Sequence, residues 1–103
     1  MSVVVLNEEN FKEEVLESKE PVLVDFFATW CGPCQMMSPI IDELSEEEKS
    51  IKICKIDTDE AEDIAREYGI MTIPCIIAFK DGKELNRSIG VVDKKSLLGL
   101  LEE

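Results

Sequence analysis

The sequence predicts an α/β fold with a central mixed five-stranded sheet and helices on both faces. Short apolar stretches of strand length alternate with segments of helical periodicity, which is typical of strands paired in parallel through right-handed crossovers. The dipeptide Asp81-Gly82 lies between two further strand-like segments. Such a pair is a strong hairpin signal, so it predicts an additional antiparallel strand at the edge of the sheet.

The composition fits one domain over residues 1–103. Hydrophobic residues make up 45% and charged residues 33%, which is typical of a globular protein and not of a disordered chain. Eleven Lys and Arg against 23 Asp and Glu give a net charge of −12, so nucleic-acid and membrane-surface binding are not expected. The chain has no histidine, which excludes Ser–His and Cys–His catalysis and His-ligated zinc.

The N-terminal half is predicted to contain two strands and two helices. Residues 2–6 are strand-like, and Asn7 is a suitable N-cap for a helix. That helix has an apolar face of Phe11, Val15 and Leu16. Residues 21–28 are almost continuously apolar, as in a strand buried on both faces. A helix that includes Pro39 is expected from about residue 33 to residue 48.

The middle of the chain continues the alternation. Residues 51–57 form the next predicted strand, and residues 60–68 form a short helix. Asp59 and Glu62 have the spacing of a capping box at its start, and Gly69 is expected to end it.

The last segments are predicted to form two strands of the sheet and a final helix. Residues 75–79 and 83–89 are the strands of the predicted hairpin. Asp93 is expected to cap a final helix. Its apolar residues are Leu97, Leu98, Leu100 and Leu101.

Two cysteines lie where the apolar segment 21–28 passes into the following helix, within the string Trp30-Cys31-Gly32-Pro33-Cys34. Cysteines three positions apart on a helical turn have Cβ atoms about 5–6 Å apart, which suits a disulfide that forms and opens with little backbone movement. Pro33 fits the first turn, where a backbone donor has no partner. Cys31 precedes the helix, whose N-terminus favours a thiolate, whereas Cys34 lies inside it. We therefore expect an exposed attacking thiol and a covered resolving thiol.

Two other uses of the cysteines stay open at this point. A zinc site would need Cys54 and Cys75 as further ligands, although both lie in strands that look fully packed. The alternative of a structural disulfide would be opposed by a reducing compartment.

The N-terminal segment indicates the compartment. It has no basic region before its short apolar run, so we expect no signal peptide. No apolar stretch approaches the roughly 20 residues of a membrane span. These features predict a cytoplasmic protein.

Further residues match one family. They are the segment 25–34, Ile73-Pro74, Lys80-Asp81-Gly82 and Gly90. With these residues the whole chain resembles the thioredoxin family. The resemblance implies a thioredoxin fold and a dithiol–disulfide oxidoreductase that reduces protein disulfides through a mixed disulfide. It also implies disulfide-containing target proteins and a thioredoxin reductase as partners. We expect no cofactor, since the chain has no nucleotide, flavin or metal motif. A monomer is the default expectation.

The resemblance assigns catalytic roles to four residues. Cys31 is the expected nucleophile and Cys34 the resolving thiol. Asp25 matches a buried carboxylate that accepts the proton of Cys34, and Lys55 matches a lysine near that carboxylate. Asp25 interrupts an apolar run, which itself predicts burial and a raised pKa. A solvated Asp25 at a sheet edge and an ordinary exposed Lys55 are the alternatives.

The resemblance also assigns a substrate-binding groove. Pro74 matches a proline that follows a cis bond and faces the dithiol, and Ile73 would offer its backbone to an extended target. Trp30 is either an apolar platform for partners or a core residue. Gly90 either flanks the groove or simply ends a strand. The predicted substrate-binding residues are Trp30, Gly32, Pro33, Ile73, Pro74, Gly90 and Val91.

Three positions depart from the family pattern. Phe27 replaces the more usual tryptophan, and Gln35 replaces a common lysine. Without that lysine, and with a net charge of −12, Cys31 is expected to be less acidic than in relatives with basic residues beside the cysteine. Cys75 replaces the usual threonine and is interpreted as a small buried residue, with a third redox thiol as the alternative. Cys54 is interpreted as a core residue.

The uncharged stretches predict a docking face. Residues 26–41, 68–79 and 88–92 contain no charged residue. In a thioredoxin-like fold they converge around the dithiol, which would give an acidic molecule one neutral, apolar face for its targets.

Overall fold

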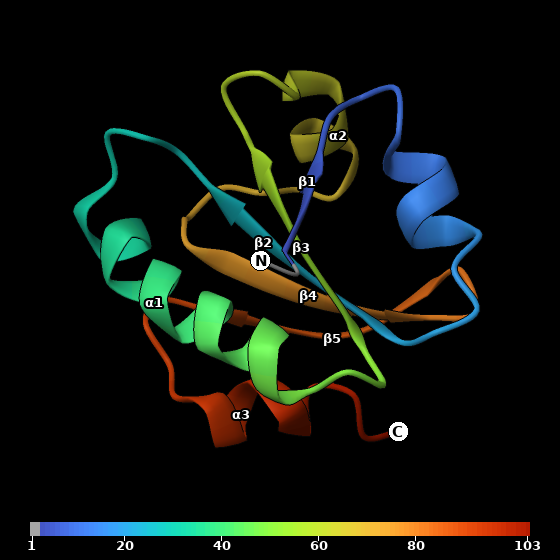
Figure 1. Ribbon diagram of the computed structural model, residues 1–103. Helices are drawn as coiled ribbons and strands as arrows, with labels where there is room; N and C mark the ends of the chain where they lie inside the picture. Colours follow the sequence, from blue (N-terminus) through green and yellow to red (C-terminus); the bar gives the residue numbers. More distant parts are fainter. Residues whose placement is uncertain (1–2) are drawn as a thin grey trace.

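The computed structural model describes residues 3–103 and contains a mixed five-stranded sheet in the order β1-β3-β2-β4-β5 (Figure 1). The strands are β1 (Val4–Leu6), β2 (Val22–Phe27), β3 (Lys52–Asp57), β4 (Cys75–Lys80) and β5 (Lys83–Ile89). β1, β3 and β2 pair in parallel, whereas β4 is antiparallel to both β2 and β5. The predicted sheet is therefore confirmed. The predicted start of the first strand, Ser2, lies outside the described residues.

Helical segments cover both faces of this sheet. They are η1 (Lys12–Leu16, a π-helical turn), α1 (Gly32–Glu47), α2 (Glu62–Glu67) and α3 (Lys94–Gly99). In Figure 1, α1 and α3 lie together on one side of the strands, and η1 and α2 lie on the other. None of the helices in the described part of the chain is long and apolar enough to cross a membrane.

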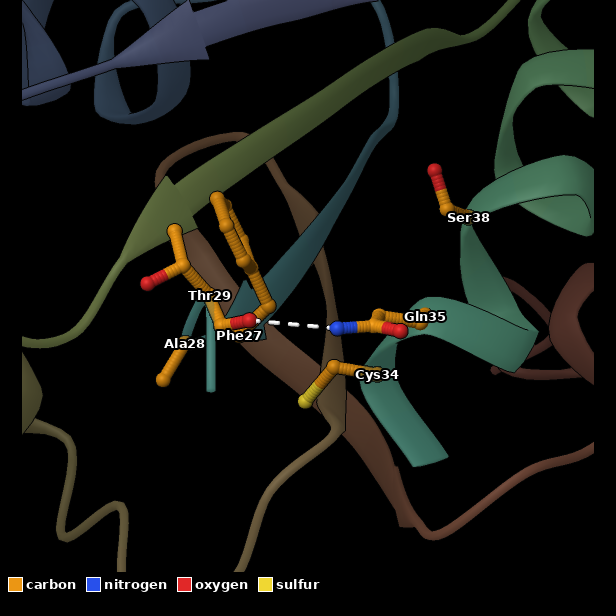
Figure 2. A pocket seen from close by; sticks show the side chains of 6 residues that line it. All are labelled: Phe27, Ala28, Thr29, Cys34, Gln35 and Ser38. Carbon is orange, nitrogen blue, oxygen red and sulfur yellow. Dashed lines mark hydrogen bonds between the residues drawn. The ribbon is translucent and has the colours of Figure 1, made fainter. Parts of the chain in front are cut away.

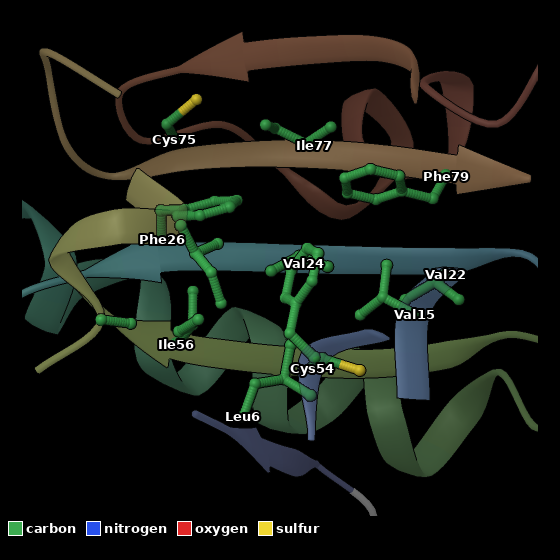
Figure 3. Close-up of a cluster of buried hydrophobic side chains, with 13 residues drawn as sticks. Leu6, Val15, Val22, Val24, Phe26, Cys54, Ile56, Cys75, Ile77 and Phe79 are labelled. Atoms are coloured by element: carbon green, nitrogen blue, oxygen red, sulfur yellow. The ribbon is translucent and has the colours of Figure 1, made fainter. Parts of the chain in front are cut away.

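Alternate strand residues point into two separate cores, because side chains of a strand alternate between the faces of the sheet. The core under α1 and α3 contains Leu23, Met37, Ile41, Leu44, Ile53, Ile76, Ala78 and Leu97. The core under η1 and α2, drawn in Figure 3, includes Phe11, Val24, Phe26, Ile56, Ile77 and Phe79. The central strands β2 and β4 are buried along almost their whole length, as the continuous apolar run predicted.

Two of the predicted signals at helix ends are confirmed, those at Asp93 and Gly69. Asn7 does not cap η1, which begins at Lys12 after the N-cap residue Phe11. The Oδ1 atom of Asn7 instead accepts hydrogen bonds from the backbone N–H groups of Glu9 and Asn10 in the turn before it. Asp93 caps α3 by accepting the N–H of Ser96 at 2.9 Å. Gly69 follows α2 with a φ of +64°. The Asp93 contact satisfies a backbone N–H that the first turn of a helix leaves unpaired.

The predicted capping box at residues 59–62 is wrong. α2 begins at Glu62 after an N-cap residue, Ala61, that makes no side-chain hydrogen bond to the helix. The backbone N–H groups of Glu60 and Ala61 are instead satisfied by the carbonyl oxygen of Asp57. The Asp59 carboxylate is engaged elsewhere, as described below.

The hairpin turn between β4 and β5 has the expected geometry. Asp81 and Gly82 both have positive φ values, +54° and +79°. This is the turn type that matches the twist of the flanking strands. Gly82 also lies against η1, since a Cβ atom at this position would be 2.9 Å from the carbonyl oxygen of Leu16.

Candidate active site

Cys31 and Cys34 lie at the N-terminus of α1 and are joined as a disulfide. Their Cα atoms are 5.2 Å apart, within the range that a disulfide requires. Cys31 is the N-cap residue of α1, and its sulfur accepts the backbone N–H of Cys34 at 3.2 Å. Pro33 occupies the first turn, where the missing N–H has no helical partner to lose. The first turn of the helix therefore directs the backbone N–H of Cys34 toward the sulfur of Cys31.

The predicted difference in exposure between the two cysteines is wrong. Cys31 is 5% exposed and Cys34 is 4% exposed. Both pack against Ala28, and the partly buried Ile73 covers the same cluster. Local sequence patterns could not indicate this cover because Ile73 lies 42 residues after Cys31, and only the resemblance brought the two together.

The loop before β4 faces the disulfide. The Ile73-Pro74 peptide bond is cis, as the resemblance implied, and the carbonyl oxygen of Ile73 is 3.9 Å from the Sγ atom of Cys31. Gly90, with a φ of +91°, directly follows β5 and donates its N–H to the carbonyl oxygen of Pro74 at 2.9 Å. Val91 beside it is exposed. The three uncharged stretches thus meet around the disulfide, as expected.

Trp30 is an exposed residue and not a core residue. Its side chain is 71% exposed, yet the indole Nε1–H donates a hydrogen bond to the Oδ2 atom of Asp59 at 2.8 Å. Sequence reasoning missed Asp59 at the site because the spacing to Glu62 suggested a helix cap. No sequence signal pairs residues 30 and 59, since the contact depends on how the loops after β2 and β3 lie together.

Asp25 is buried in the middle of the sheet. It lies on β2, between β3 and β4, so the alternative of a solvated carboxylate at a sheet edge is wrong. Its Oδ1 atom is fully enclosed and has no hydrogen-bond partner. Burial raises the pKa of Asp25 from 3.8 to about 7, and the positive charge of Lys55 opposes that rise. The predicted burial and raised pKa are both found, and this carboxyl group exchanges its proton near neutral pH.

Lys55 lies on β3 at the register position of Asp25. Its side chain is partly buried, so it is not an ordinary exposed lysine. The structure describes no ion pair between these two side chains in residues 3–103. The Lys55 Nζ atom is instead 5.8 Å from the centre of the Phe27 ring, a cation–π contact.

A small open pocket of about 210 Å³ lies beside Cys34 (Figure 2). Figure 2 shows it between the first turns of α1 and the segment that follows β2. The amide Nε2 of Gln35 spans its side by donating to the carbonyl oxygen of Thr29 at 3.2 Å. Its lining residues are Phe27, Ala28, Thr29, Cys34, Gln35 and Ser38.

Cys54 and Cys75 are buried in the core under η1 and α2, as predicted, and not beside the disulfide. Burial raises the pKa of Cys54 to about 12 and also raises that of Cys75. The disulfide cysteines belong to a separate cluster with Ala28, so the four sulfur atoms do not form one site. Within residues 3–103 no group of three or more His, Cys, Asp or Glu side chains is placed to hold a metal ion.

A cysteine pair that opens and closes within one helical turn carries two electrons to or from another disulfide. Placed on this mixed sheet and next to a cis-proline loop, the pair defines the chain as a dithiol–disulfide oxidoreductase. The Thioredoxin family model matches residues 2–103, and the chain belongs to that family.

Several curated relatives have similar sequences. A thioredoxin of Pyropia yezoensis is 49% identical over 104 residues, which cover 100% of this chain and 97% of the relative. A thioredoxin of Rickettsia felis is 52% identical over 94 residues, 90% of each chain. The M-type chloroplastic thioredoxin of Chlamydomonas reinhardtii is 46% identical over 99 residues, which cover 95% of this chain and 71% of the relative.

Proposed function

We propose that the protein is a reductant of protein disulfides in which Cys31 attacks the target and Cys34 releases it. The observation that carries this proposal is the position of the pair. Cys31 caps α1, where backbone N–H groups stabilise a thiolate, and Cys34 is one turn further on at a Cα distance of 5.2 Å.

The proposed reaction has two exchange steps. The Cys31 thiolate attacks one sulfur of the target disulfide, which forms a mixed disulfide and releases the second target sulfur as a thiolate. The Cys34 thiolate then attacks the Sγ atom of Cys31, which forms the Cys31–Cys34 disulfide and releases the first target sulfur. Two electrons pass from the protein to the target.

Asp25 is proposed as the group that accepts the proton of Cys34. Its carboxyl has a pKa of about 7, so it binds and releases a proton in the pH range where the thiol must ionise. The chain has no histidine to do this work. Lys55 is proposed to assist by its charge, since it is the cation that acts on Asp25.

The target is proposed to bind across the uncharged face around the disulfide. Trp30 and Val91 are exposed beside it, and Gly32 and Pro33 present the turn that carries Cys31. Ile73 precedes the buried Pro74, and we propose that its backbone aligns an extended target segment. Gly90 supports this loop through its bond to Pro74.

We also propose that the protein works as a monomer in the cytoplasm, contributes to redox homeostasis there, and is returned to the dithiol form by a thioredoxin reductase. These proposals rest on the family resemblance. Some relatives are named as chloroplastic, so fractionation of the source cells is the measurement that tests the compartment.

A trapping experiment tests the proposed roles of the two cysteines. Cys34→Ser should accumulate covalent adducts with target proteins through Cys31, visible as reducible bands on non-reducing gels and identified by mass spectrometry. The double variant Cys31→Ser with Cys34→Ser is the matched control and should trap nothing. If Cys31→Ser alone keeps the full activity, the catalytic proposal fails and a non-catalytic adaptor of the same fold is favoured.

The direction of electron flow needs a separate measurement. Equilibration of the purified protein with a glutathione buffer gives the fraction of oxidised Cys31–Cys34 at each buffer ratio. A reductant should stay oxidised until the buffer is strongly reducing. A pair that is already reduced in mildly reducing buffer would favour an oxidase or isomerase instead.

A further inference from the structure

Asp25 and Lys55 are neighbours that do not pair. They occupy opposed positions on the adjacent parallel strands β2 and β3, so their side chains leave the same face of the sheet. A buried carboxylate beside a lysine normally gains from a close ion pair, because the unpaired charge is costly in a low-dielectric interior. Yet Oδ1 of Asp25 has no polar partner, and none of the ion pairs among residues 3–103 includes Lys55.

The ring of Phe27 accounts for the position of the lysine. Phe27 is two residues after Asp25 on β2, so its side chain leaves the same face of the sheet. The Lys55 Nζ atom is 5.8 Å from the centre of this ring, within the range of a cation–π contact. Phe27 and Asp25 thus offer the ammonium group two alternative positions, one over an aromatic face and one at a carboxylate.

We propose that Phe27 is a positioning residue whose ring holds the Lys55 ammonium away from Asp25 and so keeps that carboxyl group without an ion-pair partner. The proposal rests on the role of Asp25 proposed above, and it explains how the site keeps a carboxyl group that exchanges protons. A close ion pair would lower the pKa of Asp25, and a carboxylate with a lower pKa is a weaker proton acceptor.

The other charged groups around Asp25 do not replace Lys55. On β4, Cys75 is influenced by Asp25 and also faces Arg87, which is engaged by Glu84. Residues 26–41 of β2 and α1 carry no charge, and their cysteines do not titrate while the disulfide is closed. On α3, Lys94 is held by Glu43 and Glu47. In the oxidised protein, Lys55 is therefore the charged group that acts on the pKa of Asp25.

The test is the titration of Asp25 in the oxidised protein, measured by NMR of its side-chain carboxyl carbon. Phe27→Leu keeps an apolar side chain but removes the aromatic face. It should release Lys55 toward Asp25 and lower the pKa of Asp25 by about one or more, the effect of an opposite charge within 4–6 Å. Phe27→Trp keeps an aromatic face and should leave the pKa within a few tenths of that of the unchanged protein.

A second background separates charge from hydration. A smaller side chain at position 27 also admits water, which would lower the pKa of Asp25 without any movement of Lys55. In Lys55→Gln protein, Phe27→Leu should therefore have almost no effect on the Asp25 titration. The proposal is overturned if Phe27→Leu leaves the pKa unchanged or raises it, or if it lowers the pKa equally in the Lys55→Gln background.

This measurement needs no turnover, so it is independent of the proposed function. If Asp25→Asn protein reduces disulfides at the unchanged rate, the role of Asp25 in catalysis fails, while the titration still decides whether Phe27 positions Lys55.

Discussion

Asp25 is a buried carboxyl group whose ionised form destabilises the folded protein. Its carboxyl lies on the central strand β2, where desolvation disfavours the charged form and raises its pKa to about 7. In the unfolded chain the same group ionises near 3.8. The folded protein therefore binds a proton that the unfolded chain has already released between these two pH values, and this difference links the pH to the stability.

The first prediction concerns that linkage in the oxidised protein. Because the folded pKa is the higher one, the contribution of Asp25 is fully present below pH 4 and is lost as the pH rises through 7. At about 1.4 kcal/mol per pKa unit, the loss above pH 8 is up to about 4 kcal/mol. Denaturant unfolding across this range should show a fall in the free energy of unfolding that Asp25→Asn removes.

A second carboxylate provides the control for this measurement. Asp93 is exposed and its pKa is lowered by the hydrogen bond from Ser96. Asp93→Asn should therefore leave the fall between pH 4 and 7 in place. If the curves of Asp25→Asn and the unchanged protein run parallel, the Asp25 carboxyl is not the group responsible.

At the residue scale, the sequence predicts what depends on neighbours along the chain. Asp25 lies within an apolar run, so its burial and raised pKa could be foreseen. The low exposure of Cys31 could not, because it depends on Ile73 from a distant loop. The contacts of Trp30 with Asp59 and of Phe27 with Lys55 likewise join residues that are far apart in the chain.

Among the elements, the β4–β5 hairpin has the strictest local requirement. Gly82 adopts a φ of +79°, and any side chain there would meet the carbonyl oxygen of Leu16 at 2.9 Å. The backbone of η1 therefore packs directly against the turn, with no room for a side chain between them. The turn thus joins the edge of the sheet to the helical segment near the N-terminus.

We expect Gly82→Ala to lower the free energy of unfolding by about 1–3 kcal/mol, since it adds both backbone strain and a close contact. Gly99→Ala is the matched control. Gly99 ends α3 and has no atom within 4 Å of an added Cβ, so this change should be neutral or stabilising by up to about 1 kcal/mol. Chemical denaturation of both variants measures the difference. Equal effects would show that the contact with Leu16 is unimportant.

The existence and order of the elements were predictable because their signals are local. The buried strands, the hairpin dipeptide and the cap at Asp93 all act within a few residues. The capping box at Asp59 failed because its residues satisfy other partners, the indole of Trp30 among them. A local motif predicts a structure only when no distant group competes for the same atoms.

For the molecule as a whole, the negative charge lies outside the segments that surround the disulfide. The net charge is −12, whereas the stretches that meet around the disulfide carry none. On the docking face proposed above, a target protein would approach a negative molecule but contact an uncharged surface. Charge should act on the encounter, while apolar contact with residues such as Trp30 and Val91 should act on the bound state.

This separation predicts opposite effects of salt on targets of opposite charge. The rate of mixed-disulfide formation with an acidic disulfide peptide should rise with ionic strength, and the rate with a basic peptide should fall, each by up to about tenfold. Stopped-flow kinetics with two peptides that differ only in flanking charges measure both. Equal salt dependence for the two peptides would contradict a role for the net charge.

The docking face itself is tested by NMR chemical shifts. On addition of a target peptide, the shifts should change around Trp30, the segment 71–74 and Val91. Changes confined to the charged surface of β5 or α3 would show that targets bind elsewhere.

The buried positions of Cys54 and Cys75 allow unfolding of the oxidised protein to be followed through the reactivity of these two thiols. Both thiols are enclosed in the core under η1 and α2, at 0% and 1% exposure, and the other two sulfur atoms are tied to each other. An alkylating reagent can therefore label the oxidised protein only while its core is open. The rate of thiol labelling therefore reports how often the core opens, and the measurement needs no dye, tag or substitution.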